Sequence, residues 1–308
     1  MLKTILTKFK LLCYNFFEKE GIFMNVTLPE EEKISKKRVI IYAVAIAICV
    51  IALIVAVCVQ ILGNDITNKI FGVSQIKSKT EEEEQTLKAN FDNLFLNSLE
   101  ITGDINADIK KQDESKDYVV TTYEKKETVS GKYEMSVFIP YINIDNETIN
   151  QYNNEIKEIF QDKAESILET EGQNVLYTVD YQGYIENNIL TVIIKSSLKQ
   201  GASAQQLIVQ TYNYDLLNNK EITLNDEIDM LALNKTAVQN KIRSEIKAEQ
   251  DKAEALQELG YEIYNRDSES DYYSIDNSNI FFVHDQNLYI IYPYGNDALT
   301  SEMDIVIV

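Results

Sequence analysis

The longest hydrophobic run of the chain lies near its N-terminus. Val39 to Leu62 contains no charged residue over 24 positions. At 1.5 Å per residue a helix of this length would measure about 36 Å, enough to cross a hydrocarbon core about 30 Å thick. A buried helix of a soluble protein rarely stays apolar on every face for six turns. We therefore predict that residues 39–62 form a transmembrane helix.

The charges that flank this run predict its orientation. Lys33–Arg38 carries four basic residues before the run, whereas residues 63–72 offer only Lys69. The positive-inside rule then leaves the N-terminus in the cytoplasm and the C-terminal domain outside. A cleaved signal peptide normally has an apolar region of only 7–15 residues, and a lipoprotein signal needs Gly or Ala where Val57 precedes Cys58. We predict an uncleaved signal anchor and a single-pass protein of the cell membrane.

The cytoplasmic segment, residues 1–38, has two interpretations. Lys19–Gly21 back-translates to a purine-rich sequence six nucleotides before the Met24 codon, a spacing that suits bacterial initiation at Met24. Alternatively, residues 1–23 form an amphipathic helix on the inner membrane surface. If translation starts at Met24, the 15 residues that remain are fewer than the about 20–30 that a standard protein interface uses on each side.

Residues 63–112 are predicted to form a stalk and an amphipathic helix. Thr80–Glu83 reads as a capping box with acidic residues at a helix start. Apolar residues follow at helical spacing, namely Leu87, Phe91, Leu94, Phe95 and Leu99. The acidic run is therefore interpreted as a solvated helix start, and the polar stretch Gly103–Lys116 as a linker.

Beyond residue 113 the hydrophobic period changes to short strands and two long helices. Strands are predicted over residues 118–129, 133–140, 175–185, 189–198 and 206–216, with a hairpin over 279–294 and a closing strand over 303–308. Helices are predicted from Asp145 or Asn146 to Leu168 and from Asn234 to Leu259. Because strands and helices do not alternate regularly, we predict an α+β fold with an antiparallel sheet and two main packed helices.

Charge and cysteines refine this picture. The whole chain has a formal net charge of −20, and residues 1–62 hold 8 of its 29 basic and 5 of its 49 acidic residues. Residues 63–308 therefore carry 21 basic and 44 acidic residues, a net charge of −23. Such a charge disfavours nucleic acid and favours cationic partners. All three cysteines precede Gly63, so the exported part has no disulfide and depends on its core alone.

Three stretches carry a family resemblance. They read TYNYDLLNNKEITLNDEI (211–228), IFFVHDQNLYIIYPYG (280–295) and VFIPYINIDNETINQYNNEI (137–156). The sequence from about Asp117 to Val308 resembles the extracytoplasmic domain of unknown function shared by the anti-sigma factor RsiV and the peptidoglycan deacetylase PdaC. The resemblance implies a PdaC-like half over 113–200 and an RsiV-like half over 201–308, in a domain linked to sensing lysozyme or to cell-wall enzymes. The stretch Gly-Asn-Asp-Ala-Leu-Thr after Tyr294 departs from the family pattern, and no catalytic domain is expected.

The sequence gives little support for a catalytic site or a metal site. His284 is the only histidine and lies beside Asp285 at a predicted hairpin tip, without a nucleophile-elbow motif. Zinc sites draw several ligands from His and Cys, and in the part of the chain after the predicted membrane run His284 is the only residue of either type. No Gly-rich phosphate loop is present. We therefore expect no enzyme, no cofactor and no metal site.

One loop invites comparison with a calcium site. Asp267, Glu269 and Asp271 alternate as at the start of a calcium loop. Tyr272 stands where Gly would make the sharp turn, and Ser278 where a bidentate Glu would bind. The loop does not match an EF-hand and is interpreted as solvated, with calcium binding left open.

Tyrosines supply the candidate partner-binding surface. Five of the nineteen gather near the C-terminus, namely Tyr272, Tyr273, Tyr289, Tyr292 and Tyr294. Tyrosine offers a rigid contact face with a polar tip, as protein and sugar partners require. Strand alternation predicts that Tyr289 and Ile291 point to one side and Ile290 and Tyr292 to the other, so about half of these rings would be core residues.

The function expected from these observations is that of a membrane-anchored binding or sensing protein of the bacterial cell envelope. A cationic wall-active protein such as a lysozyme is the partner that charge and resemblance favour together. An RsiV-like anti-sigma factor is the first alternative and requires residues 1–23 to be translated. A non-catalytic accessory protein of a cell-wall enzyme is the second. The neighbouring genes would discriminate among the three.

Overall fold

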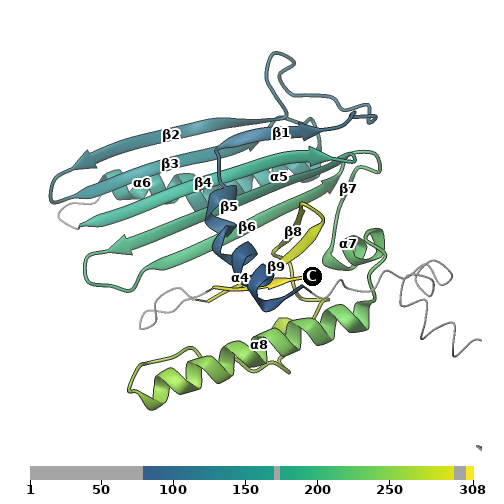
Figure 1. The fold of residues 1–308 in the computed structure, drawn as a ribbon. Helices are drawn as coiled ribbons and strands as arrows, with labels where there is room; N and C mark the ends of the chain where they lie inside the picture. The colour runs from purple at the N-terminus through teal and green to yellow at the C-terminus, as the bar shows by residue number, and fades with distance from the viewer. Residues whose placement is uncertain (1–78, 170–173, 295–302) are drawn as a thin grey trace, which may run out of the picture. The chain divides into compact units, whose positions relative to one another are not determined.

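Two β-sheets dominate the computed structural model, in which residues 79–169, 174–294 and 303–308 are described (Figure 1). The larger sheet has the order β2-β3-β4-β5-β6-β7, with β1 paired to β4 outside this path, and the smaller has the order β10-β9-β8. The large sheet contains β1 (Ser98–Thr102), β2 (Val119–Val129), β3 (Tyr133–Ile142), β4 (Val175–Glu186), β5 (Ile189–Gln200), β6 (Gln206–Asp215) and β7 (Lys220–Glu221). The small sheet contains β8 (Phe281–His284), β9 (Asn287–Pro293) and β10 (Met303–Ile307).

The helical elements lie before, between and after these strands. They are α4 (Glu81–Ala89), the 3₁₀ turn η1 (Phe91–Leu94), α5 (Glu147–Ile156), the π-helical turn η2 (Lys157–Gln161), α6 (Asp162–Glu169), α7 (Leu224–Met230), α8 (Lys235–Glu258) and the 3₁₀ turn η3 (Asp271–Tyr273). The α+β fold class is thus confirmed for the described residues. The continuous α5-η2-α6 segment and α8 correspond to the two main helices that the periodicity predicts.

The large sheet is antiparallel except along one edge of β4. Along this edge, β3 pairs in parallel with the first part of β4, beginning with Tyr133 opposite Val175 and continuing to Val179. The strand β1 pairs in parallel with the second part of β4, from Gln182 to Glu186. The prediction of an antiparallel sheet therefore needs a correction at this edge. The β5-β6 ladder spans residues 189–215, so the two predicted halves, 113–200 and 201–308, share one sheet.

Two-residue polar turns with positive φ angles form two of the hairpins. Asn187 and Asn188 join β4 to β5 with φ values of 50° and 64°, and Asp285 and Gln286 join β8 to β9 with 49° and 62°. Two consecutive residues in the left-handed region match the right-handed twist of a hairpin. Both turns lie where the sequence predicts them.

Three apolar cores separate four layers of structure, which follow one another in Figure 1. The first core lies between α5-α6 and one face of the large sheet and includes Ile149, Phe160 and Val192. The next lies between the opposite face of that sheet and the small sheet, and it includes Ile193 and Ile291. The last lies between the small sheet and the helices α7 and α8. Both faces of each sheet are therefore covered over part of their area.

The segment after Lys79 is part of this packing. The predicted capping box is present, because the Thr80 side chain accepts from the Glu83 N–H and Glu83 accepts from the Thr80 N–H. The helix ends at Ala89, however, and Phe91 in η1 is only 1% exposed. Residues 98–102, expected within a stalk and helix, form the strand β1 because their backbone completes the open edge of β4.

Two further corrections concern neighbouring segments. Three apolar residues in the stretch predicted as a polar linker, Ile105, Ala107 and Ile109, pack against the first core. In α6, Leu168 is 37% exposed although the sequence places it on the apolar stripe. The π-helical turn η2 adds a residue to the helix, which rotates the positions that follow it.

Predictions for the N-terminal region lie outside the described residues. Among residues 79–169, 174–294 and 303–308, no helix is long and apolar enough to span a membrane. The predicted span 39–62, the cytoplasmic segment 1–38 and the question of Met24 all fall before residue 79. They stay predictions.

Candidate functional site: two tyrosine clusters

The structure places four of the five predicted site tyrosines in one neighbourhood. Tyr272 and Tyr273 come from η3, Tyr292 from β9, and Tyr294 follows that strand. We call these four residues and Tyr264 the C-terminal tyrosine cluster. Its ring centroids lie within contact range, for example 5.0 Å between Tyr273 and Tyr292. Burial differs sharply within the cluster, because Tyr272 is 45% exposed whereas Tyr273, Tyr292 and Tyr294 are buried.

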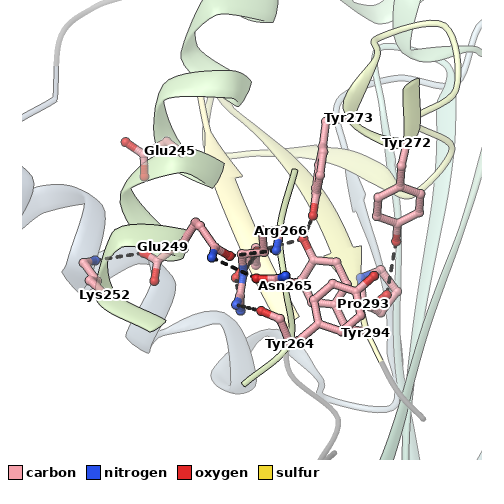
Figure 2. Close-up of polar contacts among 12 residues, drawn as sticks. Glu245, Glu249, Lys252, Tyr264, Asn265, Arg266, Tyr272, Tyr273, Pro293 and Tyr294 are labelled. Atoms are coloured by element: carbon pink, nitrogen blue, oxygen red, sulfur yellow. Dashed lines mark hydrogen bonds and ion pairs between the residues drawn. The ribbon is translucent and has the colours of Figure 1, made fainter. Parts of the chain in front are cut away.

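A buried ion pair forms the polar centre of this cluster, as Figure 2 shows around Arg266. The Arg266 Nε donates to Asp304 Oδ2 at 2.7 Å, and its Nη2 lies 3.2 Å from Asp304 Oδ1. The Tyr294 hydroxyl donates to the same Asp304 Oδ2 at 2.8 Å. Bidentate pairing of this kind adds geometric specificity to the charge attraction. It connects the loop after α8 to the closing strand β10.

The hydroxyls of Tyr272, Tyr273 and Tyr292 also have partners. The Tyr273 and Tyr294 hydroxyls lie 2.7 Å apart, and the Tyr292 hydroxyl lies 2.8 Å from Ser278 Oγ. Tyr272 donates to the Pro293 carbonyl at 3.1 Å (Figure 2). Every tyrosine hydroxyl named here is therefore hydrogen-bonded within the chain.

Local sequence explains how Arg266 reaches this position. Gly260, with φ at 92°, ends α8 and turns the chain back. Gln250 of α8 then accepts from the Arg266 N–H at 2.7 Å. The Tyr264 ring stacks on the Tyr294 ring at 4.2 Å between centroids. These contacts orient the guanidinium toward Asp304.

Electrostatics keep the buried tyrosines protonated. Burial raises the pKa of Tyr273 to about 12, against the smaller lowering by its hydrogen bond to Tyr294. Burial also raises the pKa of Tyr294, and the Asp304 carboxylate adds to that rise. Protonated Tyr294 can therefore serve as a donor to Asp304 at any physiological pH.

The fifth predicted tyrosine lies elsewhere. Tyr289 faces the core between the two sheets and stacks on Phe282 at 4.6 Å between centroids. Ile290 and Tyr292 belong to the core under α8. The predicted alternation along β9 is thus confirmed, and it separates Tyr289 from the other four.

The single histidine and the acidic loop make ordinary polar contacts with nearby residues. His284 Nε2 lies 3.5 Å from Asp285 Oδ2, and its ring lies 6.0 Å from the Tyr184 ring. In the acidic loop, Asp267 accepts from the Glu269 N–H, and Glu269 pairs with Arg243 at 3.2 Å. Within the described residues no three His, Cys, Asp or Glu side chains gather as metal ligands.

A second group of tyrosines emerges only from the structure. Tyr152 of α5 and Tyr212 of β6 lie 4.7 Å apart between ring centroids, and Tyr214 of β6 lies 6.4 Å from Tyr152. We call these three the sheet-edge tyrosine cluster. All three are buried, and none of their hydroxyls meets full hydrogen-bond geometry within the described part of the chain, although side-chain hydrogen bonding to Glu221, Glu155 and Asn146 contributes to the shifts of their pKa values. Periodicity assigns Tyr152 to an apolar stripe and gives no sign of this property.

Sequence reasoning also missed the ion pair of the first cluster. Asp304 is an acidic residue within the apolar strand MDIVIV, and Arg266 is the basic residue of the polar loop that follows α8. A charged residue in a buried strand needs a partner of opposite charge. That signal could have pointed to Asp304, although the sequence alone does not single out Arg266 as its partner.

Comparison with known proteins gives structural neighbours only. No family model matches the chain, and no curated protein matches it. A solved DUF3298 family protein from Pseudomonas aeruginosa PAO1 is 8% identical with a TM-score of 0.33, over 65% of this chain and 90% of that chain. A DUF3298 member from Bacteroides fragilis is 13% identical with a TM-score of 0.33, over 61% of this chain and 85% of that chain. DUF3298 denotes a domain of unknown function. Structural similarity at TM-scores this low assigns no activity to this chain.

Proposed function

We propose that this chain is a binding or sensing protein of the bacterial cell envelope. In this proposal residues 39–62 anchor it in the cell membrane, the N-terminus faces the cytoplasm, and residues 63–308 lie outside. The protein has no catalytic role of its own and binds a cationic wall-active protein such as a lysozyme. The observation that carries the proposal is the net charge of −23 over residues 63–308.

Acidic residues on the surface of the described domain support this choice of partner. Glu155 and Glu221 are exposed, and neither takes part in an ion pair within the described residues. A field of one sign steers a partner of opposite charge and raises the rate of association. Screening by salt weakens such steering, because the Debye length falls from about 10 Å at 0.1 M to about 3 Å at 1 M.

Binding by the full chain in lipid nanodiscs tests the proposal. We expect lysozyme to bind, with an association rate that falls steeply as the salt concentration rises. An acidic protein of similar size serves as the control and should not bind. An affinity for lysozyme that does not change with ionic strength, or no binding at low salt, would overturn the proposed partner.

The location is tested separately. Alkaline carbonate washing of native membranes should leave the chain in the membrane fraction, and protease added outside the cell should digest the domain beyond residue 63. Release of the chain into the supernatant would contradict the anchor. Protection of the domain in intact cells stripped of their wall would contradict the orientation.

A further inference from the structure

One end of the large sheet carries a hollow on the face turned away from α5 and α6. On the helix-facing side of this end, Met135, Tyr177 and Leu198 belong to the first core. Because side chains alternate along a strand, their neighbours point to the opposite face. There the ends of β3, β4, β5 and β6 project past the small sheet (Figure 1). The hollow measures about 500 Å³, within the range of about 300–1,000 Å³ that small-ligand sites occupy.

Strand register places six side chains around this hollow in two rows. In the first row, Glu134 of β3 lies beside Leu176 of β4, and Leu176 lies beside Lys199 of β5. The second row crosses the same three strands and consists of Ser136, Thr178 and Ser197. All six residues line the hollow. One row thus offers a carboxylate, an apolar side chain and an ammonium group, and the other offers three hydroxyls. We call these six residues the sheet-end site.

The two charges of the first row flank an apolar side chain and form no ion pair with each other. Neighbouring strands lie about 4.7–4.9 Å apart, so the backbones of Glu134 and Lys199 are separated by about 9–10 Å. Between them the Leu176 side chain is 49% exposed. The Lys199 ammonium donates to the Ser203 carbonyl at 2.5 Å, which leaves it two further N–H donors. Both charges are therefore accessible to a ligand that enters the hollow.

This arrangement selects a ligand that carries one charge of each sign at its two ends. A simple cation or anion would pair with only one of the two side chains. A single amino acid holds both charges on one carbon, a poor match to side chains that start about 9–10 Å apart. A peptide of two or three residues separates its charged ends by up to about 7–11 Å, because an extended chain spans at most about 3.3–3.6 Å per residue. Its peptide groups can also form hydrogen bonds with the row of hydroxyls.

We propose that the sheet-end site binds a zwitterionic peptide of two or three residues. The N-terminal ammonium of the peptide pairs with Glu134, and its C-terminal carboxylate pairs with Lys199. Its middle lies on Leu176, and its peptide groups form hydrogen bonds with the Ser136 and Thr178 hydroxyls. This ligand is additional to the cationic protein of the proposed function, and its binding does not depend on that partner.

The test uses the full chain in nanodiscs, with ¹³C-methyl leucine as the label and L-alanyl-L-alanine as the probe. The dipeptide should shift the methyl resonances of Leu176. Leu217 lies after β6 and is 52% exposed, so it is the internal control and should not shift. The Nα-acetylated dipeptide lacks the ammonium and the dipeptide amide lacks the carboxylate. Each should bind about two- to fivefold more weakly, the effect of one exposed ion pair.

Charge reversal tests whether the two ends of the peptide are recognised. Glu134→Lys should weaken the dipeptide by about tenfold, because two cations then meet the same ligand. Glu134→Lys with Lys199→Glu should restore the affinity to within about twofold, since the dipeptide can bind in the opposite direction. Lys247→Glu with Glu254→Lys reverses two exposed charges on α8 and is the matched control, with an expected change of less than about twofold.

Each outcome decides the proposal. It would be overturned by equal shifts of Leu176 and Leu217, by the absence of a Leu176 shift at the solubility limit of the dipeptide, or by equal affinities for the three peptide forms. A double reversal that binds as weakly as Glu134→Lys, with a native near-ultraviolet circular dichroism spectrum, would overturn it too. Because the dipeptide is measured directly, a failure to bind lysozyme would contradict the proposed partner and leave the sheet-end site standing.

Discussion

The C-terminal and sheet-edge tyrosine clusters bury the same side chain in two different ways. The hydroxyls of Tyr272, Tyr273, Tyr292 and Tyr294 all have partners, and the Asp304 carboxylate is matched by the guanidinium of Arg266. Around Tyr212 the hydroxyls lack a partner at full hydrogen-bond geometry within the described residues, and the nearby Glu155 and Glu221 form no ion pair there. Tyr273, Tyr292 and Tyr294 are as buried as Tyr152, Tyr212 and Tyr214, and ring contacts join the members of both clusters, so neither property distinguishes the two clusters.

Hydrogen-bond satisfaction separates the two clusters. A fully paired network stabilises the fold and leaves no group for a ligand, whereas an unpaired one costs stability and keeps its donors and acceptors available. The five tyrosines that the sequence marks as a partner surface mostly belong to the first kind. Only Tyr272 among them keeps a large exposed area, and partner binding there stays a prediction.

The largest effect is expected from Asp304→Ala. Removal of the Asp304 carboxylate deletes a buried partner of both the Arg266 guanidinium and the Tyr294 hydroxyl, so the free energy of unfolding should fall by about 3–5 kcal/mol. Urea titration of the full chain in nanodiscs measures this change. The double variant Arg266→Met with Asp304→Leu is the control and should recover most of the loss. A loss below about 1 kcal/mol would mean that water replaces the ion pair.

A smaller loss is expected from Tyr294→Phe. The variant keeps the ring stacked on Tyr264 and removes the hydroxyl that bonds to Asp304 and Tyr273. The free energy of unfolding should fall by about 1–3 kcal/mol, the range for a hydrogen bond to a charged group. The same urea titration applies. An unchanged midpoint would show that the Tyr294 hydroxyl does not contribute to the network.

Tyr212→Phe should act with the opposite sign. Because its hydroxyl is buried and lacks a partner at full hydrogen-bond geometry within the described residues, the variant should raise the free energy of unfolding by about 1 kcal/mol. Tyr294→Phe is the matched control, since both variants delete one phenol oxygen from a buried ring. A loss of stability in Tyr212→Phe would reveal that this hydroxyl has a partner in the folded chain.

The smallest effect is expected from Glu155→Gln with Glu221→Gln. Both side chains are exposed and form no ion pair within the described residues, so the free energy of unfolding should change by less than about 0.5 kcal/mol. Thermal unfolding by circular dichroism checks this value. A larger loss would give these carboxylates a structural role.

Periodicity predicts most of the secondary structure because local patterns carry it. The hairpin turns at Asn187–Asn188 and Asp285–Gln286, the cap at Thr80 and the two faces of β9 all follow from nearby residues. The strand β1 does not, since its pairing with β4 joins segments about 80 residues apart. Whether a buried hydroxyl finds a hydrogen-bond partner also depends on residues far apart in the sequence. The sequence alone therefore shows Tyr152 only as a core residue.

The attachment of β1 would have a mechanical consequence under the proposed N-terminal anchor. Tension on the chain before Thr80 reaches the domain through α4, where Lys88 and Lys241 link this helix to α8 by ion pairs with Glu245 and Glu84. It then reaches β1, whose five residues run parallel to β4. A pull along a strand loads such a ladder in shear, so its hydrogen bonds resist together instead of opening one at a time. If the chain is anchored as proposed, this edge of the large sheet is the part of the domain that bears the load first.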